Sequence, residues 1–302
     1  MGQVGAVLRG LAIGAVCMLA SVDGHAQPTK PPTSAEILAA APAADWRVID
    51  PENTLYLDLP TGRVVIELDP AFAPQHVANI KTLVREHYFD GLFIERAQDN
   101  YVVQWGDPDA RKPLGSAKTG LPAEYSRKTA PGEAFTALPD PDTYAPQTGF
   151  EDGFAVARDP LRGETWLTHC YGAVGVGRDV PPDTGSGAEL YAVIGNAPRG
   201  LDRNIALVGK VVQGIELLSV MPRGAAAMGF YDKPGQRIPI RQVRVAADVP
   251  AADQLRLEEM RTDSQSFAAW IGAKRNHTDP WFVEPVGRVE VCNVPVPVRT
   301  AK

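Results

Sequence analysis

The side chains best suited to chemistry are grouped in one stretch, residues 64–107, with the sequence VVIELDPAFAPQHVANIKTLVREHYFDGLFIERAQDNYVVQWGDP. Arg96 and Gln104 stand in its second half, with Tyr101 and Val102 between them. A guanidinium stays charged and offers several fixed N–H donors, so it can stabilise charge that develops in a transition state. Taken alone, Arg96 fits that role or a surface salt bridge.

Other kinds of chemistry find little support. The sequence lacks the common signatures of phosphate-binding loops, serine hydrolases, zinc peptidases and dithiol redox sites. Gly172, Gly175 and Gly177 do not have the spacing of a dinucleotide-binding loop. His169 and Cys170 lack a second pair of metal ligands, so His169 is expected at a partly buried strand end. We therefore expect no metal and no cofactor.

Short β-rich segments must position these residues. The runs LYLDL and VVIEL, at 55–59 and 64–68, alternate apolar side chains around a Pro-Thr-Gly-Arg turn and predict a hairpin. Pro74 suits the first turn of a helix that ends before Asp90-Gly91, and a second short helix is expected over 214–221. Many strands with few helices predict a closed antiparallel barrel capped by helices.

The ordered motifs of this stretch resemble the cyclophilin-type peptidyl-prolyl isomerases. That family has an A-P-x-x-V-x-N-F-x-x-L helix, then Y-x-D-G, then F-H-R-V-I-x-x-F-M-x-Q-G-G-D. Downstream, residues 172–178, 188–191 and 201–211 resemble its later motifs G-x-L-x-M-A, S-Q-F-F and L-D-G-x-x-x-x-F-G-x-V. The matching residues in the first stretch are Ala73, Pro74, Val77, Asn79, Leu83, Tyr88, Asp90, Gly91, Arg96, Gln104, Gly106 and Asp107.

The resemblance implies a mainly β fold, a closed antiparallel eight-stranded barrel capped by two helices. It covers a domain at 49–248 with an insertion at about 129–165. Residues 249–302 lie beyond it and are expected to form an additional helix and a tail. Leu257, Met260, Phe267 and Ile271 form an apolar stripe at helical spacing within the helix predicted over 251–275. That helix packs on the barrel or serves as a partner-binding face.

The implied activity is cis–trans isomerisation of X-Pro bonds, with proline-containing polypeptides as substrates. Rotation about an amide must break resonance against a barrier of about 18–20 kcal/mol, and needs no nucleophile or metal. By resemblance Arg96 donates hydrogen bonds to the twisted amide and Gln104 orients the substrate backbone. The residues implied to bind the substrate around them are Tyr101, Val102, Glu189, Tyr191 and Leu201.

Three departures from the family pattern leave a second interpretation open. Glu95 replaces a histidine and could pair with Arg96, Val102 shortens the pocket wall, and Glu189 replaces a glutamine. These changes favour slower turnover, or a peptide-binding or chaperone module without activity. The position of the Arg96 guanidinium, open to the groove or paired with a carboxylate, discriminates between the two.

The first 26 residues have the layout of a secretory signal peptide. Arg9 precedes an apolar run from Leu11 to Ala20, and small residues lead to a cleavage site after Ala26. We expect a periplasmic or secreted protein that assists folding of exported proteins and has no stable membrane insertion after cleavage. Residues 27–48, rich in Pro and Ala, are predicted as a linker with little fixed structure.

Cleavage would leave two cysteines, Cys170 and Cys292, which could form one disulfide in an oxidising compartment or remain separate thiols. The whole chain has 30 Lys and Arg against 36 Asp and Glu, a formal net charge of −6, and no long basic run. Nucleic acid is therefore not expected as a partner. The sequence carries no prediction of oligomeric state.

Overall fold

A computed structural model describes residues 1–2, 5, 30–107 and 109–301. Pro32–Lys302 form one compact unit. Apart from Met1, Gly2 and Gly5, the predicted signal peptide lies outside the described residues, as do residues 27–29 of the predicted linker. Among the helices of the described part, none has the length and apolar character to cross a bilayer.

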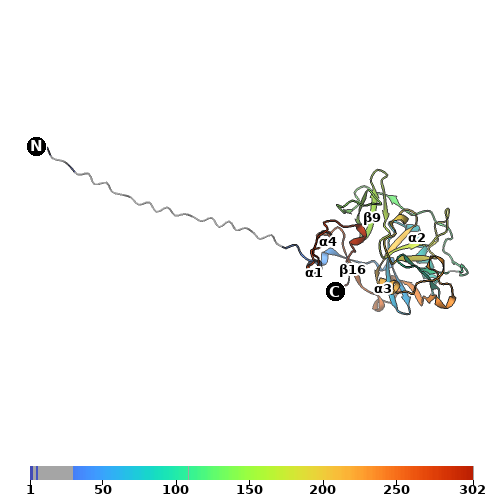
Figure 1. Ribbon diagram of the computed structural model, residues 1–302. Helices are drawn as coiled ribbons and strands as arrows, with labels where there is room; N and C mark the ends of the chain where they lie inside the picture. The colour runs from blue at the N-terminus through green and yellow to red at the C-terminus, as the bar shows by residue number, and fades with distance from the viewer. Residues whose placement is uncertain (3–4, 6–29, 108, 302) are drawn as a thin grey trace. The chain divides into compact units, whose positions relative to one another are not determined.

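The compact unit is mainly β, as predicted, and its largest sheet is antiparallel throughout (Figure 1). This sheet contains β14 (Ile238–Pro239), β4 (Phe93–Ala97), β5 (Val102–Gly106), β12 (Leu190–Val193), β11 (Ala173–Val176), β13 (Leu207–Gln213), β3 (Gly62–Leu68), β2 (Thr54–Leu59) and β15 (Gln242–Val245), in that spatial order. Its two edge strands, β14 and β15, are separated in sequence by only Ile240 and Arg241. One short piece of chain therefore pairs with β4 at one edge and with β2 at the other, which requires the sheet to curl.

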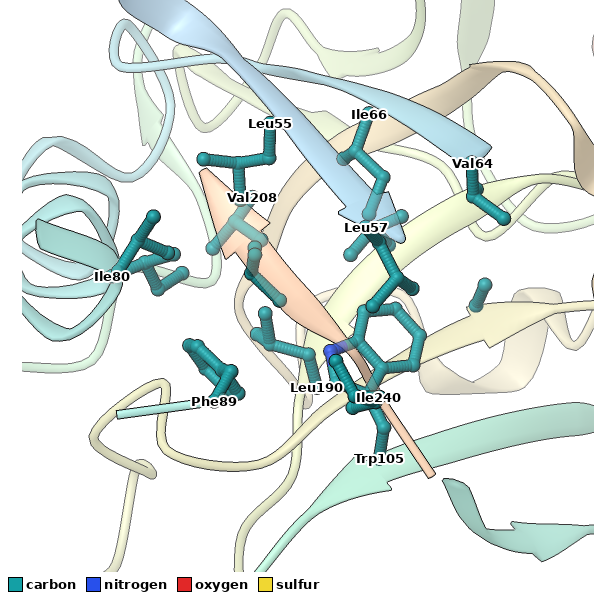
Figure 2. Close-up of a cluster of buried hydrophobic side chains, with 14 of the residues drawn as sticks. Leu55, Leu57, Val64, Ile66, Ile80, Phe89, Trp105, Leu190, Val208 and Ile240 are labelled. Carbon is teal, nitrogen blue, oxygen red and sulfur yellow. The ribbon is translucent and has the colours of Figure 1, made fainter. Parts of the chain in front are cut away.

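The interior of the curled sheet holds the main hydrophobic core. The predicted hairpin is present as β2 and β3, and all six of its alternating apolar residues are buried there. Helix α2 (Pro74–Arg85) begins at Pro74 and packs Ile80 against the core. Phe89, from the turn after the helix, and Trp105 of β5 pack in the same core (Figure 2). Burial of each such side chain contributes about 1.5–3 kcal/mol. The second predicted helix is α3 (Ile215–Ser219), ended by the turn before Pro222.

The insertion predicted at about 129–165 forms most of a second sheet beside the first. This sheet contains β6 (Arg127–Lys128), β10 (Glu164–Leu167), β9 (Phe154–Asp159), β8 (Gln147–Glu151) and β7 (Thr136–Ala137), in that spatial order. Leu138 and Phe150 of the insertion pack with Phe267 and Ile271 in a second core. The insertion therefore supports the C-terminal extension.

The predictions for the two ends of the unit were wrong in part. Residues 34–48 are not an unstructured linker. They form α1 (Ser34–Ala40), whose N-terminus is closed by a Thr33–Glu36 capping box, and β1 (Trp46–Val48). The single helix predicted over 251–275 is divided. Leu257 and Met260 belong to β16 (Leu257–Met260), and α4 (Gln265–Asn276) begins only after the N-cap Ser264.

The physical reason lies in a third sheet, in which β16 pairs with β1 on one side and β17 (Val298–Thr300) on the other. Both pairings are long-range, so they override the local helical pattern. Beside this sheet, α1 contacts α4 (Figure 1). The remaining short helical turns are η1 (Ala43–Asp45), η2 (Pro51–Asn53), η3 (Arg199–Leu201), η4 (Ala227–Gly229), η5 (Pro234–Gln236), η6 (Ala246–Asp248), η7 (Ala251–Asp253) and η8 (Val291–Asn293).

Buried ion pairs and one disulfide attach the extension to the curled sheet. Arg47 of β1 lies 2.7 Å from Glu67 of β3 and 2.5 Å from Glu259 of β16, and Lys210 of β13 contacts both carboxylates. The structure pairs Cys170 with Cys292 of η8 in a disulfide.

Candidate active site

A β-bulge places the two residues predicted to act in catalysis on one face of the sheet. Ile94 of β4 pairs with Trp105 of β5, but Arg96 pairs with Gln104, so Glu95 is an extra residue in β4. Ile94 and Trp105 are buried in the core, and regular alternation would direct Arg96 to that same face. The bulge moves Arg96 to the opposite face, beside Gln104.

Three acceptors hold the Arg96 guanidinium. Nε donates to the carbonyl oxygen of Met228 at 2.6 Å, one terminal nitrogen donates to Gln104 Oε1 at 3.1 Å, and the other donates to the side chain of Gln98. The rings of Tyr101 and Phe230 lie 5.5 and 5.3 Å from its central carbon. In the described part of the chain no carboxylate lies within ion-pair distance of Arg96, so it is not paired with Glu95 or Glu189.

A cavity of about 430 Å³ opens at this guanidinium. All seven residues predicted for catalysis and substrate binding line it: Arg96, Tyr101, Val102, Gln104, Glu189, Tyr191 and Leu201. The motifs that carry them are far apart in sequence, and the pairing of β12 with β5 brings them together. The cavity places the apolar and aromatic side chains of Val102, Tyr191 and Leu201 next to the Arg96 cation and several polar and acidic groups.

Two glycines make room for the far wall of the cavity. A Cβ atom on Gly175 would lie 2.3 Å from the hydroxyl oxygen of Tyr191, and one on Gly177 would lie 2.9 Å from the Cβ of Glu189. Larger residues at these positions would displace both side chains. Gly175 and Gly177 thus serve close packing beside the cavity.

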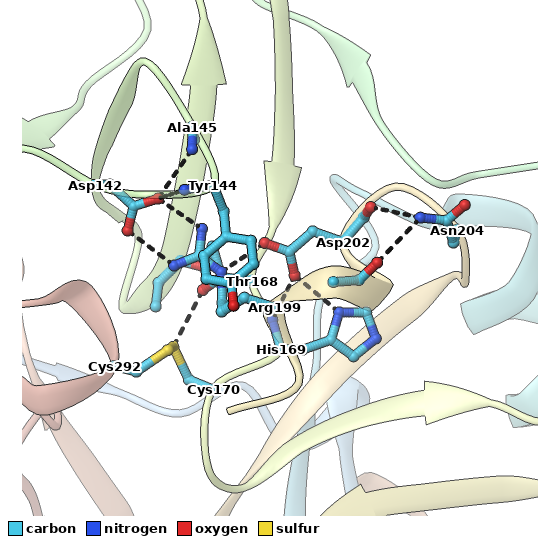
Figure 3. A network of polar contacts seen from close by, with 12 residues as sticks. Asp142, Tyr144, Ala145, Thr168, His169, Cys170, Arg199, Asp202, Asn204 and Cys292 are labelled. Carbon is cyan, nitrogen blue, oxygen red and sulfur yellow. Dashed lines mark hydrogen bonds and ion pairs between the residues drawn. A yellow bond between two sulfur atoms is a disulfide. The ribbon is translucent and has the colours of Figure 1, made fainter. Parts of the chain in front are cut away.

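A buried polar network lies behind this wall, and Figure 3 shows its members His169, Asp202, Arg199 and Asp142. The Tyr191 hydroxyl and His169 Nε2 are 2.9 Å apart, and His169 Nδ1 lies 2.9 Å from Asp202. Arg199 contacts Asp202 at 2.6 Å and Asp142 of the insertion at 3.1 Å. Burial raises the pKa of Tyr191 well above its usual range, so its hydroxyl keeps its proton. His169 thus anchors Tyr191, a role that the sequence did not reveal.

Two carboxyl groups flank Gln104 on the side away from Arg96. Gln104 Nε2 donates to Glu189 at 2.8 Å and to Glu95 at 3.3 Å. Burial, together with the nearby Glu189 carboxylate, raises the pKa of Glu95 to about 7, against the opposing effect of the Gln104 hydrogen bond. Burial also raises the pKa of Glu189, with Gln104 again opposing the shift. The amide of Gln104 therefore links Arg96 to a pair of acids.

Several residues that line the cavity were missed at the sequence level. Met228 and Phe230 belong to the loop after α3, outside every motif of the family, and no pattern in the sequence points to them. Asp179 and Asp183 add acidic groups beside Glu189. In the described part of the chain, no group of three or more His, Cys, Asp or Glu side chains is placed to hold a metal ion.

Comparisons with known proteins agree with the fold and the motifs. The sequence model described as cyclophilin type peptidyl-prolyl cis-trans isomerase/CLD matches residues 54–245. A probable peptidyl-prolyl cis-trans isomerase of Brucella suis is 29% identical over 178 residues, which is 59% of this chain and 76% of that one. A peptidyl-prolyl cis-trans isomerase-like 1 protein of Gibberella zeae is 24% identical over 196 residues, covering 65% of this chain and 96% of that one.

Among solved structures, the cyclophilin AquaCyp293 of Hirschia baltica superimposes with a TM-score of 0.70 at 24% identity. The match covers 89% of this chain and 98% of that one, so the shared fold extends beyond the residues that the family model matches. This chain is a member of the cyclophilin-type peptidyl-prolyl cis-trans isomerase family.

Proposed function

We propose that this chain isomerises X-Pro bonds in exported proteins and that Arg96 stabilises the twisted amide. The observation that carries the proposal is the position of the Arg96 guanidinium, which faces the cavity and has no carboxylate partner among the described residues. Three of its five N–H groups are held by protein acceptors, and the other two are left for a substrate. These acceptors fix the orientation of the Arg96 guanidinium before the substrate binds.

The geometry favours the transition state over the planar ground state. As the amide twists, the lone pair of the prolyl nitrogen localises and becomes an acceptor. A guanidinium placed beside it gains a hydrogen bond that is absent in the planar amide, and such differential binding is what accelerates a reaction. Tyr191 and Val102 hold the proline ring, and Gln104, fixed by Glu189, orients the backbone.

Action on exported proteins is supported by the signal-peptide layout of residues 1–26 and by the disulfide between Cys170 and Cys292. Disulfides persist in oxidising compartments and are rare in the cytosol. The two observations together support a periplasmic or secreted location.

The test is exchange between the cis and trans forms of a short Ala-Pro peptide, followed by NMR with residues 27–302. We expect acceleration by the parent chain and its loss in Arg96→Ala. Arg96→Lys keeps the charge but loses the fixed fork and should recover little activity. Arg162→Ala, on an exposed hairpin, is the matched control and should retain full activity. Peptide binding without acceleration would instead identify a peptide-binding module.

A further inference from the structure

The loop that follows α4 exposes a group of large apolar side chains. Trp281 is 84% exposed and Val283 is 96% exposed, and Phe282 and Val286 are exposed beside them. Single exposed apolar residues are ordinary, but four within six consecutive positions concentrate apolar surface in one loop, where the rings of Trp281 and Phe282 lie 5.1 Å apart. Such patches mark sites of contact with a membrane or a protein.

The loop that carries these exposed side chains is fixed at its base by several contacts. The rings of His277 and Phe282 lie 4.1 Å apart, and the Phe282 amide donates to the carbonyl of Asp279 at 3.1 Å. The Gly287 amide donates to the carbonyl of Arg275 at 2.9 Å, which closes the loop onto the end of α4. The structure therefore holds the apolar tip outward.

The first residues of the compact unit, Pro32 and Ser34, lie at the base of this loop. The backbone and hydroxyl of Ser34 donate to the Asp279 carboxylate at 3.0 and 2.7 Å, and Thr278 Oγ1 donates to the carbonyl of Pro32 at 2.8 Å. Asp279 is two residues from Trp281. The sequence that precedes Pro32 contains the apolar run from Leu11 to Ala20, the part of the chain that the sequence predicts to enter a membrane.

We propose that residues 281–286 are a membrane-contact loop that places Trp281, Phe282, Val283 and Val286 in the interfacial region of a lipid bilayer. Tryptophan is favoured at that depth because its ring is apolar and its N–H can stay hydrated. Charged residues near the loop are of mixed sign without a basic excess, with Lys274, Arg275 and Arg288 against Asp140, Asp279, Glu284 and Glu290. Apolar contact therefore carries the binding, and a zwitterionic surface suffices.

Such binding is peripheral and reversible, because one short loop enters the interface and no helix of the described part could cross the bilayer. It keeps the domain at the membrane where exported chains emerge, even after the N-terminal segment is removed. The loop shares no residue with the lining of the active-site cavity.

The tryptophans make the test specific. Of the five in the sequence, Trp46, Trp105, Trp166 and Trp270 are buried, so Trp281 dominates any change on contact with lipid. Residues 27–302, which include the complete compact unit with both hydrophobic cores, are mixed with phosphatidylcholine vesicles. We expect co-sedimentation, a blue shift of fluorescence, and quenching by lipids brominated on their acyl chains.

Matched variants distinguish vesicle binding through residues 281–286 from non-specific hydrophobic binding. Trp281→Ser combined with Val283→Ser should reduce vesicle binding at least tenfold, whereas Trp281→Phe should retain most of it. Leu161→Ser removes a side chain that is 100% exposed on the β9–β10 hairpin and should leave binding unchanged. All variants should keep the isomerase activity of the parent, so failure of this proposal is distinguishable from failure of the proposed function.

Two results would overturn the membrane proposal. One is the absence of both sedimentation and spectral change with the parent chain. The other is a dimer in light scattering, formed without lipid and lost in the double variant, which would assign the patch to contact between two copies of the chain.

Discussion

Replacing Glu95 by glutamine tests the electrostatics beneath the active site. Glu95 is 1% exposed, it is the extra residue of the β4 bulge, and its Oε2 has no hydrogen-bond partner among the described residues. Glutamine keeps the length and the acceptor that faces Gln104 but cannot ionise. The substitution therefore removes a charge and leaves the shape of the bulge in place.

The size of the effect follows from the pKa of this carboxyl. Its pKa is about 7 in the folded chain against the ordinary 4.5. Because the folded pKa is the higher one, Glu95 costs no stability below pH 4.5, costs progressively more as the pH rises to 7, and its full cost remains above pH 7. The difference corresponds to at most about 3 kcal/mol in the free energy of unfolding.

The assay is urea unfolding of the parent chain and of Glu95→Gln at pH 5 and at pH 8. The variant should gain about 2.5 kcal/mol relative to the parent between the two pH values, because only the parent carries the buried charge and part of its cost is already present at pH 5. Glu284→Gln, at an exposed position, is the control and should show no such change. Isomerase activity should also change less between pH 6 and pH 8 in Glu95→Gln than in the parent.

An identical difference between Glu95→Gln and parent at both pH values would refute this reasoning. It would mean that Glu95 ionises in the folded chain as readily as in water. The stability of the bulge would then not depend on protonation of the Glu95 carboxyl.

Three further predictions concern the wall of the cavity and the extension. Glu189→Gln should shift preference by a few fold from Lys-Pro toward Glu-Pro peptides, since it removes one negative charge from the cavity, and the ratio of kcat/KM for the two peptides measures this. Tyr191→Phe should lower the free energy of unfolding by about 1–3 kcal/mol, because it leaves the buried His169 Nε2 without its partner, and urea unfolding would detect it. Cys292→Ser should destabilise the chain by up to about 4–5 kcal/mol, since it opens the loop closed with Cys170, and the loss should match that of the parent in reductant. An unchanged peptide ratio, an unchanged unfolding curve for Tyr191→Phe, or equal midpoints with and without reductant would count against the respective argument.

The sequence predicted the members of the site better than their geometry. The resemblance to the cyclophilin motifs was enough to predict seven residues that all line one cavity. The bulge at Glu95 could not be predicted, because it depends on how β4 is paired with β5 and not on either strand alone. The same limit applies to Met228, which reaches Arg96 from a loop whose sequence follows no motif.

At the ends of the unit, local signals were present but incomplete. Thr33 and Glu36 have the spacing of a capping box and could have predicted α1 within the supposed linker. Leu257 and Met260 have a spacing that also suits a helix, and only their distant partner strands decide for β16. Pairing between segments far apart in the chain is the feature that is hardest to predict from a single sequence.

The sheet formed by β1, β16 and β17 has a consequence for the order in which the chain becomes ordered during synthesis. Trp46 of β1 pairs with Met260 of β16, which is synthesised roughly 200 residues later, and β17 is synthesised after β16. A ribosome therefore releases most of the curled sheet before the first strand of this one can pair. Until then β1 has no partner strand, and pairing of β17 with β16 completes this sheet.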